Sequence, residues 1–290
     1  MTSRIDYNNP KDSGAFGLPF HYELVSDKKR VTTFKKAIQL TCKNKRVLGS
    51  GTGSAIFSIL AAKAGAKKVF AVEMDSNIFK FAELNVEKSD FSNVIKLIQK
   101  DIRKVTLEDL DNEKVDVVIA ENLSTWQVTE PEIPIMNYVN KILIKDRGIS
   151  LPNVIYNYLE LAHSQFRFEN AIDLKTYYFE FTGIHKPINL SRKIIFSKVN
   201  LREINSTIID HTVGVKVIKN GILNSLRLTS PLQLFDNITF DSSDCLMPPV
   251  IVPLENDVSV SKGDNVLVNI RYRCNTNWDT VVCIAKVEYK

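Results

Sequence analysis

The sequence has little of what marks a metal site, a disulfide framework or a membrane span. Its four cysteines, Cys42, Cys245, Cys274 and Cys283, show no Cys-x-x-Cys spacing and no nearby paired histidines, so neither a zinc site nor a set of disulfides is indicated. No run approaches the ~18 apolar residues that a membrane-spanning helix needs, and the N-terminus lacks the apolar stretch of a signal peptide. We therefore expect a soluble, cytoplasmic protein without a resident metal or a membrane partner.

The chain also lacks the composition of a disordered or fibrous protein. Of its 290 residues 44% are hydrophobic and 24% are charged, which indicates a globular protein, and the length suggests two domains. The net charge of +5 is local, because residues 1–46 hold 10 Lys plus Arg against 4 acids and the other 244 residues hold 28 against 29. No aromatic residues are interleaved with these cations as in single-strand binders. We interpret them as a solvated helix face and expect no nucleic-acid partner.

Residues 46–151 alternate short apolar strands with helical segments. The expected strands are Arg46–Leu48, Val69–Glu73, Val94–Ile98, Val115–Glu121 and Ile149–Leu151. The second and fourth are nearly continuous apolar runs, which is typical of strands covered on both faces. Between the first two, Ala55–Lys63 has apolar residues at helical spacing. The pattern predicts an α/β domain with a mostly parallel sheet.

After about Pro152 the apolar residues repeat with period 2 rather than 3.6. The clearest alternating runs are residues 265–272 and 281–289, and the polar turn Asn275–Asn277 between them predicts a hairpin. We expect an antiparallel sandwich or barrel in this half. The predicted domains are therefore residues 1–152 and residues 153–290.

A glycine-rich turn joins the first expected strand to the first helix. Gly51 and Gly53 lie in Val47-Leu-Gly-Ser-Gly-Thr-Gly-Ser-Ala55, where a ligand can press against the backbone and the helix N-terminus. Glu73, at the end of the second strand, can accept both ribose hydroxyls of an adenosine. A Gly-x-Gly sequence by itself also occurs in tight turns that bind no ligand. In combination with Glu73, it predicts a nucleotide-binding site.

The glycine pattern separates the candidate nucleotides. A Gly-x-Gly-x-x-Gly fingerprint would need glycine at Ser54 or Ile56, and the Gly-Lys-Ser/Thr of a phosphate-binding P-loop is absent from the sequence. This leaves S-adenosylmethionine, which has no pyrophosphate. Asp101 and Ile102, just beyond the third strand, would then lie against the adenine, although a simple helix cap explains Asp101 equally well.

The segment Val47–Glu73 resembles, without gaps, the first motif of the protein arginine methyltransferases, which are class I S-adenosylmethionine-dependent methyltransferases. The register makes Gly51, Gly53 and Ala55 the equivalents of the family's three glycines, and Glu73 its ribose-binding acid. Upstream, residues 21–30 are similar to a helical segment of the family. An arginine of that segment pairs with the carboxylate of the cofactor, and the resemblance implies this role for Arg30. The resemblance implies a Rossmann-like domain followed by a β-barrel.

Two glutamates directly after the fourth strand have the spacing of the family's double-glutamate loop. Glu121 and Glu130 are nine residues apart. Guanidinium is a planar cation with forked donors, so paired carboxylates can grip it and orient one nitrogen toward a methyl donor. The resemblance therefore implies an N-methyltransferase in which Glu121 and Glu130 orient an arginine side chain.

Other positions depart from the family pattern. Gly49 stands in place of a common acid, Ala55 in place of the third glycine, and Asn122 in place of an aromatic residue. The family's Thr-His-Trp loop has no counterpart, because Ser242–Pro253 contains neither His nor Trp, and whether His211 or Trp278 reaches the pocket is open.

These departures leave alternatives. The acceptor is either an arginine in a protein or peptide, or a small guanidine, amine or peptide natural product. A third alternative is a degenerate methyltransferase fold that acts as a scaffold. Family members usually dimerise through a helical arm, and residues 166–190 occupy its place in shortened form, so a homodimer is a further expectation.

Overall fold

The computed structural model of the protein describes residues 17–288. Its α-helices are α1 (Leu18–Ser26), α2 (Lys28–Thr41), α3 (Ile56–Lys63), α4 (Ser76–Glu87) and α5 (Glu132–Ile142). The strands of its first half are β1 (Arg46–Ser50), β2 (Lys68–Glu73), β3 (Ile95–Gln99), β4 (Val115–Ala120) and β5 (Ile144–Leu151). Those of its second half are β6 (Val154–His163), β7 (Arg167–Phe168), β8 (Ile172–Asp173), β9 (Tyr178–Phe179), β10 (Ile188–Asn189), β11 (Ile194–Asn200), β12 (Ile208–Lys216), β13 (Gly221–Thr229), β14 (Leu232–Phe235), β15 (Ile238–Phe240), β16 (Val250–Val260), β17 (Asn265–Arg273) and β18 (Val282–Glu288).

The first half is the α/β domain that the alternating pattern predicts. Its five parallel strands follow the order β3-β2-β1-β4-β5. Strand β1 is buried along its whole length, as expected of a central strand covered on both faces. The connection reverses direction between β1 and β4, so the loops that follow these two strands border one crevice, where ligands bind in open α/β sheets.

The second half is antiparallel, but its hydrogen bonds do not close a barrel. Eight strands form a curled half-barrel centred on β6, and β12, β17 and β18 form a separate sheet. The buried side chains of Val266, Val268 and Ile270 lie on one face of β17, so this sheet has one apolar face to cover. The predicted antiparallel second domain is confirmed, and the expected β-barrel takes the form of a half-barrel with a second sheet.

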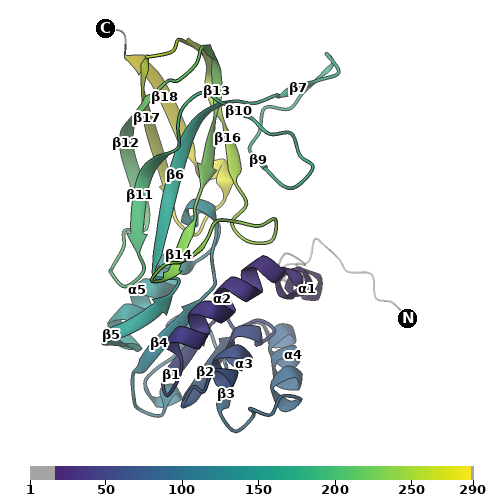
Figure 1. The fold of residues 1–290 in the computed structure, drawn as a ribbon, viewed down its shortest axis with the longest axis vertical. Coiled ribbons are helices and arrows are strands. Elements are labelled where there is room, and N and C mark those ends of the chain that lie inside the picture. The colour runs from purple at the N-terminus through teal and green to yellow at the C-terminus, as the bar shows by residue number, and fades with distance from the viewer. Residues whose placement is uncertain (1–16, 289–290) are drawn as a thin grey trace.

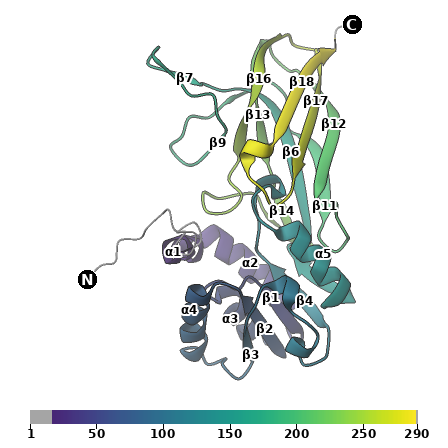
Figure 2. The same cartoon turned by 180° about the vertical axis from the view of Figure 1, so that it is seen from behind.

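Helix α2 connects the two halves. It contacts α3 and β5 of the first half and β14 and β15 of the second, and both views place it between them (Figure 1, Figure 2). Strand β5 ends at Leu151 and β6 begins at Val154. A domain boundary near Pro152 stays a prediction.

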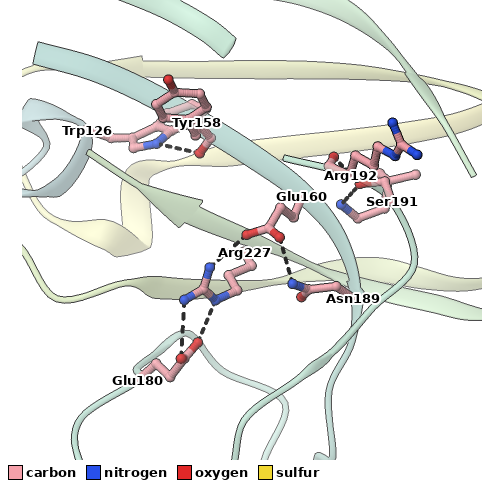
Figure 3. A network of polar contacts seen from close by, with 9 residues as sticks. Trp126, Tyr158, Glu160, Glu180, Asn189, Ser191, Arg192 and Arg227 are labelled. Atoms are coloured by element: carbon pink, nitrogen blue, oxygen red, sulfur yellow. Dashed lines mark hydrogen bonds and ion pairs between the residues drawn. The ribbon is translucent and has the colours of Figure 1, made fainter. Parts of the chain in front are cut away.

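An arm extends from the half-barrel between β6 and β11. The β7–β8 hairpin projects away from the body, while β9 returns and pairs with β16 (Figure 1). Arg227 of β13 fastens the arm, because its guanidinium donates to Glu180 at 2.6 Å and to Glu160 at 2.7 Å (Figure 3). Within residues 17–288 we find no helix of the length and hydropathy that crossing a membrane requires.

Candidate functional site

A cavity lies at the crevice between the ends of β1 and β4. Its lining includes four of the predicted site residues, Arg30, Gly51, Gly53 and Glu121. These residues come from α2, the turn after β1 and the loop after β4. The topology thus brings together side chains that are up to 91 positions apart in sequence.

The turn after β1 needs its glycines. Gly51 and Gly53 both have positive φ, at 67° and 55°. A Cβ on Gly51 would overlap the amide of Asn122, and one on Gly53 would come within 2.8 Å of the His21 ring. Ala55 also has a positive φ, 68°, which glycine adopts without strain and alanine does not. The turn therefore presents bare backbone to the cavity.

Glu73 closes this turn from the end of β2. Its carboxylate accepts the N–H of Gly53 at 3.0 Å and the N–H of Asp75 at 2.9 Å. The side chain is buried, and its two oxygens are held by backbone donors that follow β1 and β2. An oriented carboxylate at this position is what ribose hydroxyls require.

Arg30 and Glu121 form a buried bidentate ion pair. The Arg30 Nε and Nη2 donate to the two Glu121 oxygens at 2.8 and 2.6 Å, and Nη1 donates to the Leu24 carbonyl. The guanidinium also lies over the ring of Phe57, 4.7 Å from its centroid. Asp27 caps α2 by accepting the Arg30 N–H, so the start of the helix sets the position of this arginine.

Glu130 has a different environment at the other end of the same loop. Among residues 17–288 no hydrogen bond or ion pair reaches its carboxylate, and its backbone N–H donates to Ser124 Oγ at 3.0 Å. Burial, with a smaller contribution from the charge of Glu121, raises the pKa of Glu130 to about 7. The two predicted glutamates are therefore electrostatic neighbours, and one of them is unpaired.

The sequence analysis missed a third carboxylate, that of Glu132 in the first turn of α5. It is 1% exposed, and its Oε2 accepts the Ser124 N–H at 2.9 Å. Burial raises its pKa well above the usual range. No spacing rule singles out this residue, because a glutamate in a first helical turn is ordinary in sequence.

Asp101 and Ile102 do not line the cavity. Asp101 caps a short 3-10 helix and pairs with Arg103 at 2.6 Å, a contact that lowers the Asp101 pKa. The cap is the alternative that the sequence left open, and contact with adenine stays a prediction for both residues. Ile102 is buried in the core.

His21 is the cavity-lining residue that motif reasoning left without a role. It stands over Gly53, and burial lowers its pKa. His211 and Trp278 are elsewhere: His211 packs edge-on against Phe196, and Trp278 packs against Tyr177. Neither replaces the missing Thr-His-Trp loop in this cavity.

These residues fit the chemistry of S-adenosylmethionine. A Cβ-free turn leaves room beside the backbone, Glu73 offers an oriented carboxylate, and Arg30 is a cation in the lining of the cavity. Glu73 would hold the ribose, Arg30 the amino acid carboxylate, and the Gly51–Gly53 turn the group between them. Within the described part of the chain, no cluster of His, Cys, Asp and Glu could hold a metal ion.

Comparisons of sequence agree with this assignment. Residues 33–129 match the family model of the ribosomal protein L11 methyltransferase. An uncharacterized protein of Methanocaldococcus jannaschii is 28% identical over 88% of this chain and 92% of its own length. Protein arginine N-methyltransferase 2 of Dictyostelium discoideum is 32% identical, over 49% of this chain and 27% of that protein. The chain thus spans about a quarter of this named relative.

Comparisons of structure extend the likeness to both halves. Arabidopsis thaliana protein arginine methyltransferase 10 superposes with a TM-score of 0.75, at 16% identity, over 93% of this chain and 97% of that one. The Trypanosoma brucei PRMT1 enzyme-prozyme heterotetrameric complex with AdoHcy superposes with a TM-score of 0.74, at 16% identity. The superposition covers 92% of this chain and 96% of that one. At this identity the likeness concerns the fold. The family match and the sequence relatives, on this fold, identify the chain as a class I methyltransferase that uses S-adenosylmethionine and that is similar to, but divergent from, the protein arginine methyltransferases.

Proposed function

We propose that the protein methylates the guanidinium of an arginine side chain in a protein or peptide. The observation that carries the proposal is the pair Glu121 and Glu130, two carboxylates on one loop beside the cofactor cavity, close enough for the charge of Glu121 to raise the pKa of Glu130. An acidic site of this kind is complementary to a cationic acceptor. The named relatives are arginine N-methyltransferases, which supports the same acceptor.

The residues of the chain would act mainly by alignment and electrostatics. S-adenosylmethionine supplies an activated methyl group when it is bound, so the protein needs no nucleophile of its own. Glu121, held by Arg30, would fix one edge of the acceptor, and the unpaired Glu130 would bind the other. Methylation of a guanidinium nitrogen releases one N–H proton, and a carboxylate with a pKa of about 7 can accept it and pass it to water.

Glu121→Gln and Glu130→Gln test the roles of the two carboxylates. Each amide keeps the shape of the side chain and removes its charge, so methyl transfer is expected to fall at least about a hundredfold. Cofactor binding, measured by calorimetric titration, should stay within a few-fold of the wild type for Glu130→Gln. Full transfer activity in either variant would refute the two-carboxylate mechanism.

A second acceptor class is favoured by one contact. Both oxygens of Glu121 are already engaged by Arg30, which leaves Glu130 as the free carboxylate, and a single carboxylate suits a small guanidine or an amine. The missing Thr-His-Trp loop points the same way. An assay of free arginine, arginine peptides, small guanidines and amines, side by side, separates the two classes by their kcat/KM values.

We further propose a homodimer formed through the arm. Ile172, Leu174 and Ile188 of the arm are more than half exposed, and such side chains gain by burial against a second copy. The trypanosomal neighbour belongs to a heterotetrameric complex, which is a property of that protein but supports association of this fold. A cytoplasmic location also stays part of the proposal.

A further inference from the structure

Two consecutive residues in the middle of the double-glutamate loop have left-handed backbone. Trp126 has φ 57° and ψ 18°, and Gln127 has φ 57°. Neither is glycine, and such conformations cost roughly 1–3 kcal/mol each. They persist only where the surrounding structure holds them, so the contacts of these two residues identify what holds the loop.

Those contacts come from the second half of the chain. Gln127 and Asn157 of β6 exchange two amide hydrogen bonds: Gln127 Nε2 donates to Asn157 Oδ1 at 3.1 Å, and Asn157 Nδ2 donates to Gln127 Oε1 at 2.8 Å. Both side chains are buried. A reciprocal amide pair satisfies donors and acceptors together and therefore fixes both side chains in a single orientation.

Trp126 is anchored beside this pair. Its indole is fully buried, stacks on Phe196 at 4.5 Å between centroids, and donates to the Tyr158 carbonyl at 3.2 Å (Figure 3). Its backbone N–H donates to Ser230 Oγ, and Ser230 in turn donates to Asn157 Oδ1. The strained turn is thus built into the half-barrel by one continuous hydrogen-bonded cluster.

The two glutamates are consequently held by different parts of the molecule. Glu121 follows β4 and is bonded to Arg30 in the first half. Glu130 comes after the anchored turn. Its own N–H is bonded to Ser124 within the loop, and the chain leading to it is bonded to the second half, where the Thr276 N–H donates to the Val128 carbonyl at 2.7 Å. The position of Glu130 relative to Glu121 therefore depends on how the half-barrel holds the turn.

We propose that Gln127 and Asn157 are positioning residues whose amide pair sets the placement of Glu130 beside Glu121. The inference rests on the proposed function of the two glutamates and deepens it. It assigns to the half-barrel a role in aligning the acceptor site, through residues that do not line the cofactor cavity.

Gln127→Gly separates positioning from stability. Glycine adopts the positive φ without strain, which offsets part of the stability lost with the amide pair. Asn157 keeps its hydrogen bonds to Ser197 and Ser230, so the protein should still fold. Free of its anchor, Glu130 should shift, and kcat for arginine peptides should fall about ten- to a hundredfold. The calorimetric affinity for S-adenosylmethionine should stay unchanged.

A conservative pair of variants guards against misfolding. Gln127→Asn shortens the side chain by one methylene, tolerates left-handed backbone and cannot reach Asn157. Adding Asn157→Gln restores the total length of the pair and should restore most of kcat. Asn224→Leu is the matched control, since Asn224 also makes a two-bond amide contact, with Ser164, away from the loop. It should lower stability and leave kcat unchanged.

Titration of Glu130 tests the placement without any acceptor. In protein labelled with 13C at glutamate carboxyls, the wild-type Glu130 signal should titrate near pH 7, and in Gln127→Gly it should move toward the ordinary value of 4.5. Wild-type kcat together with a wild-type titration in Gln127→Gly would overturn the inference. Should the wild type methylate no arginine at all, the proposed acceptor fails, and the titration still decides the positioning role.

Discussion

Glu121 and Glu130 are the same residue type on one loop, and their surroundings make them different. Glu121 is neutralised by a bidentate arginine, while Glu130 is partly buried and has no partner among residues 17–288. The pKa of Glu130 rises to about 7 because burial disfavours its charged form. The proposed function requires an ionised Glu130 to bind a cation, and near pH 7 this residue is half protonated.

The first prediction concerns pH. Because the acceptor cation needs an ionised Glu130, kcat/KM for arginine peptides should rise with pH along a limb centred near 7. Well below that pH it should fall about tenfold per unit. Initial rates between pH 5.5 and 9, with saturating cofactor, measure this limb. A flat profile across the range would contradict the assigned role of Glu130.

The ionised Glu130 carboxylate should also lower the free energy of unfolding of the protein at high pH. Its folded pKa exceeds the ordinary 4.5, so the folded protein binds the proton more tightly than the unfolded chain, and stability falls as pH rises from about 4.5 to about 7. Glu130→Gln removes that loss. Urea unfolding at pH 8 should show the variant more stable by roughly 1–3 kcal/mol, with little difference at pH 4. Equal stability at both values would contradict the burial of the charge.

The glycine turn is the element on which we predict that cofactor binding depends. Its backbone follows positive φ at Gly51, Gly53 and Ala55, and Glu73 holds it from the neighbouring strand. The Gly-x-Gly spacing and the acid at the strand end were both visible in the sequence, because each expresses a local need for φ above zero or for a strand terminus.

Gly53→Ala tests this element. The new Cβ would meet the His21 ring and force alanine into a left-handed conformation, so the affinity for S-adenosylmethionine should fall at least tenfold and stability by about 1–2 kcal/mol. Gly263→Ala is the control, with φ 98° and no atom within 4 Å of its Cβ. It should lose similar stability and bind cofactor normally. Equal cofactor affinity in both variants would remove the turn from the site.

Periodicity predicted the parallel sheet better than it predicted the second half. The predicted first-half strands coincide with β1–β4 to within two residues at each end, since a fully apolar run has few other placements, whereas β5 begins five residues before the predicted Ile149. Alternation in residues 153–290 predicted antiparallel strands but not their grouping, because period 2 says nothing about which edges pair. Strands β12, β17 and β18 form their own sheet through pairing between residues that are far apart in the sequence.

At the scale of the whole molecule, the site depends on contacts that no motif encodes. Folding rather than sequence spacing brings together the Arg30–Glu121 pair and the Gln127–Asn157 pair. Folding also buries Glu132. The resemblance supplied the residue types at several of these positions. It did not supply their partners, such as the Arg103 to which Asp101 is bonded.

The arm makes a prediction at the same scale. Burying its exposed apolar residues against a second copy should give a dimer, and Ile172→Glu combined with Leu174→Glu should yield a monomer because charges replace that apolar contact. Sedimentation velocity across a concentration series measures the state. Ile208→Glu, at an equally exposed position on β12, should leave the dimer intact. A wild-type monomer at all concentrations would contradict the arm interface.

The most direct test of the central claim is transfer of labelled methyl from S-adenosylmethionine into a cell lysate, followed by acid hydrolysis and identification of the labelled product. Our account predicts labelled methylarginine with the wild-type protein and none with Glu130→Gln. Label recovered in lysine, in another side chain or in a small amine, with no methylarginine, would contradict it.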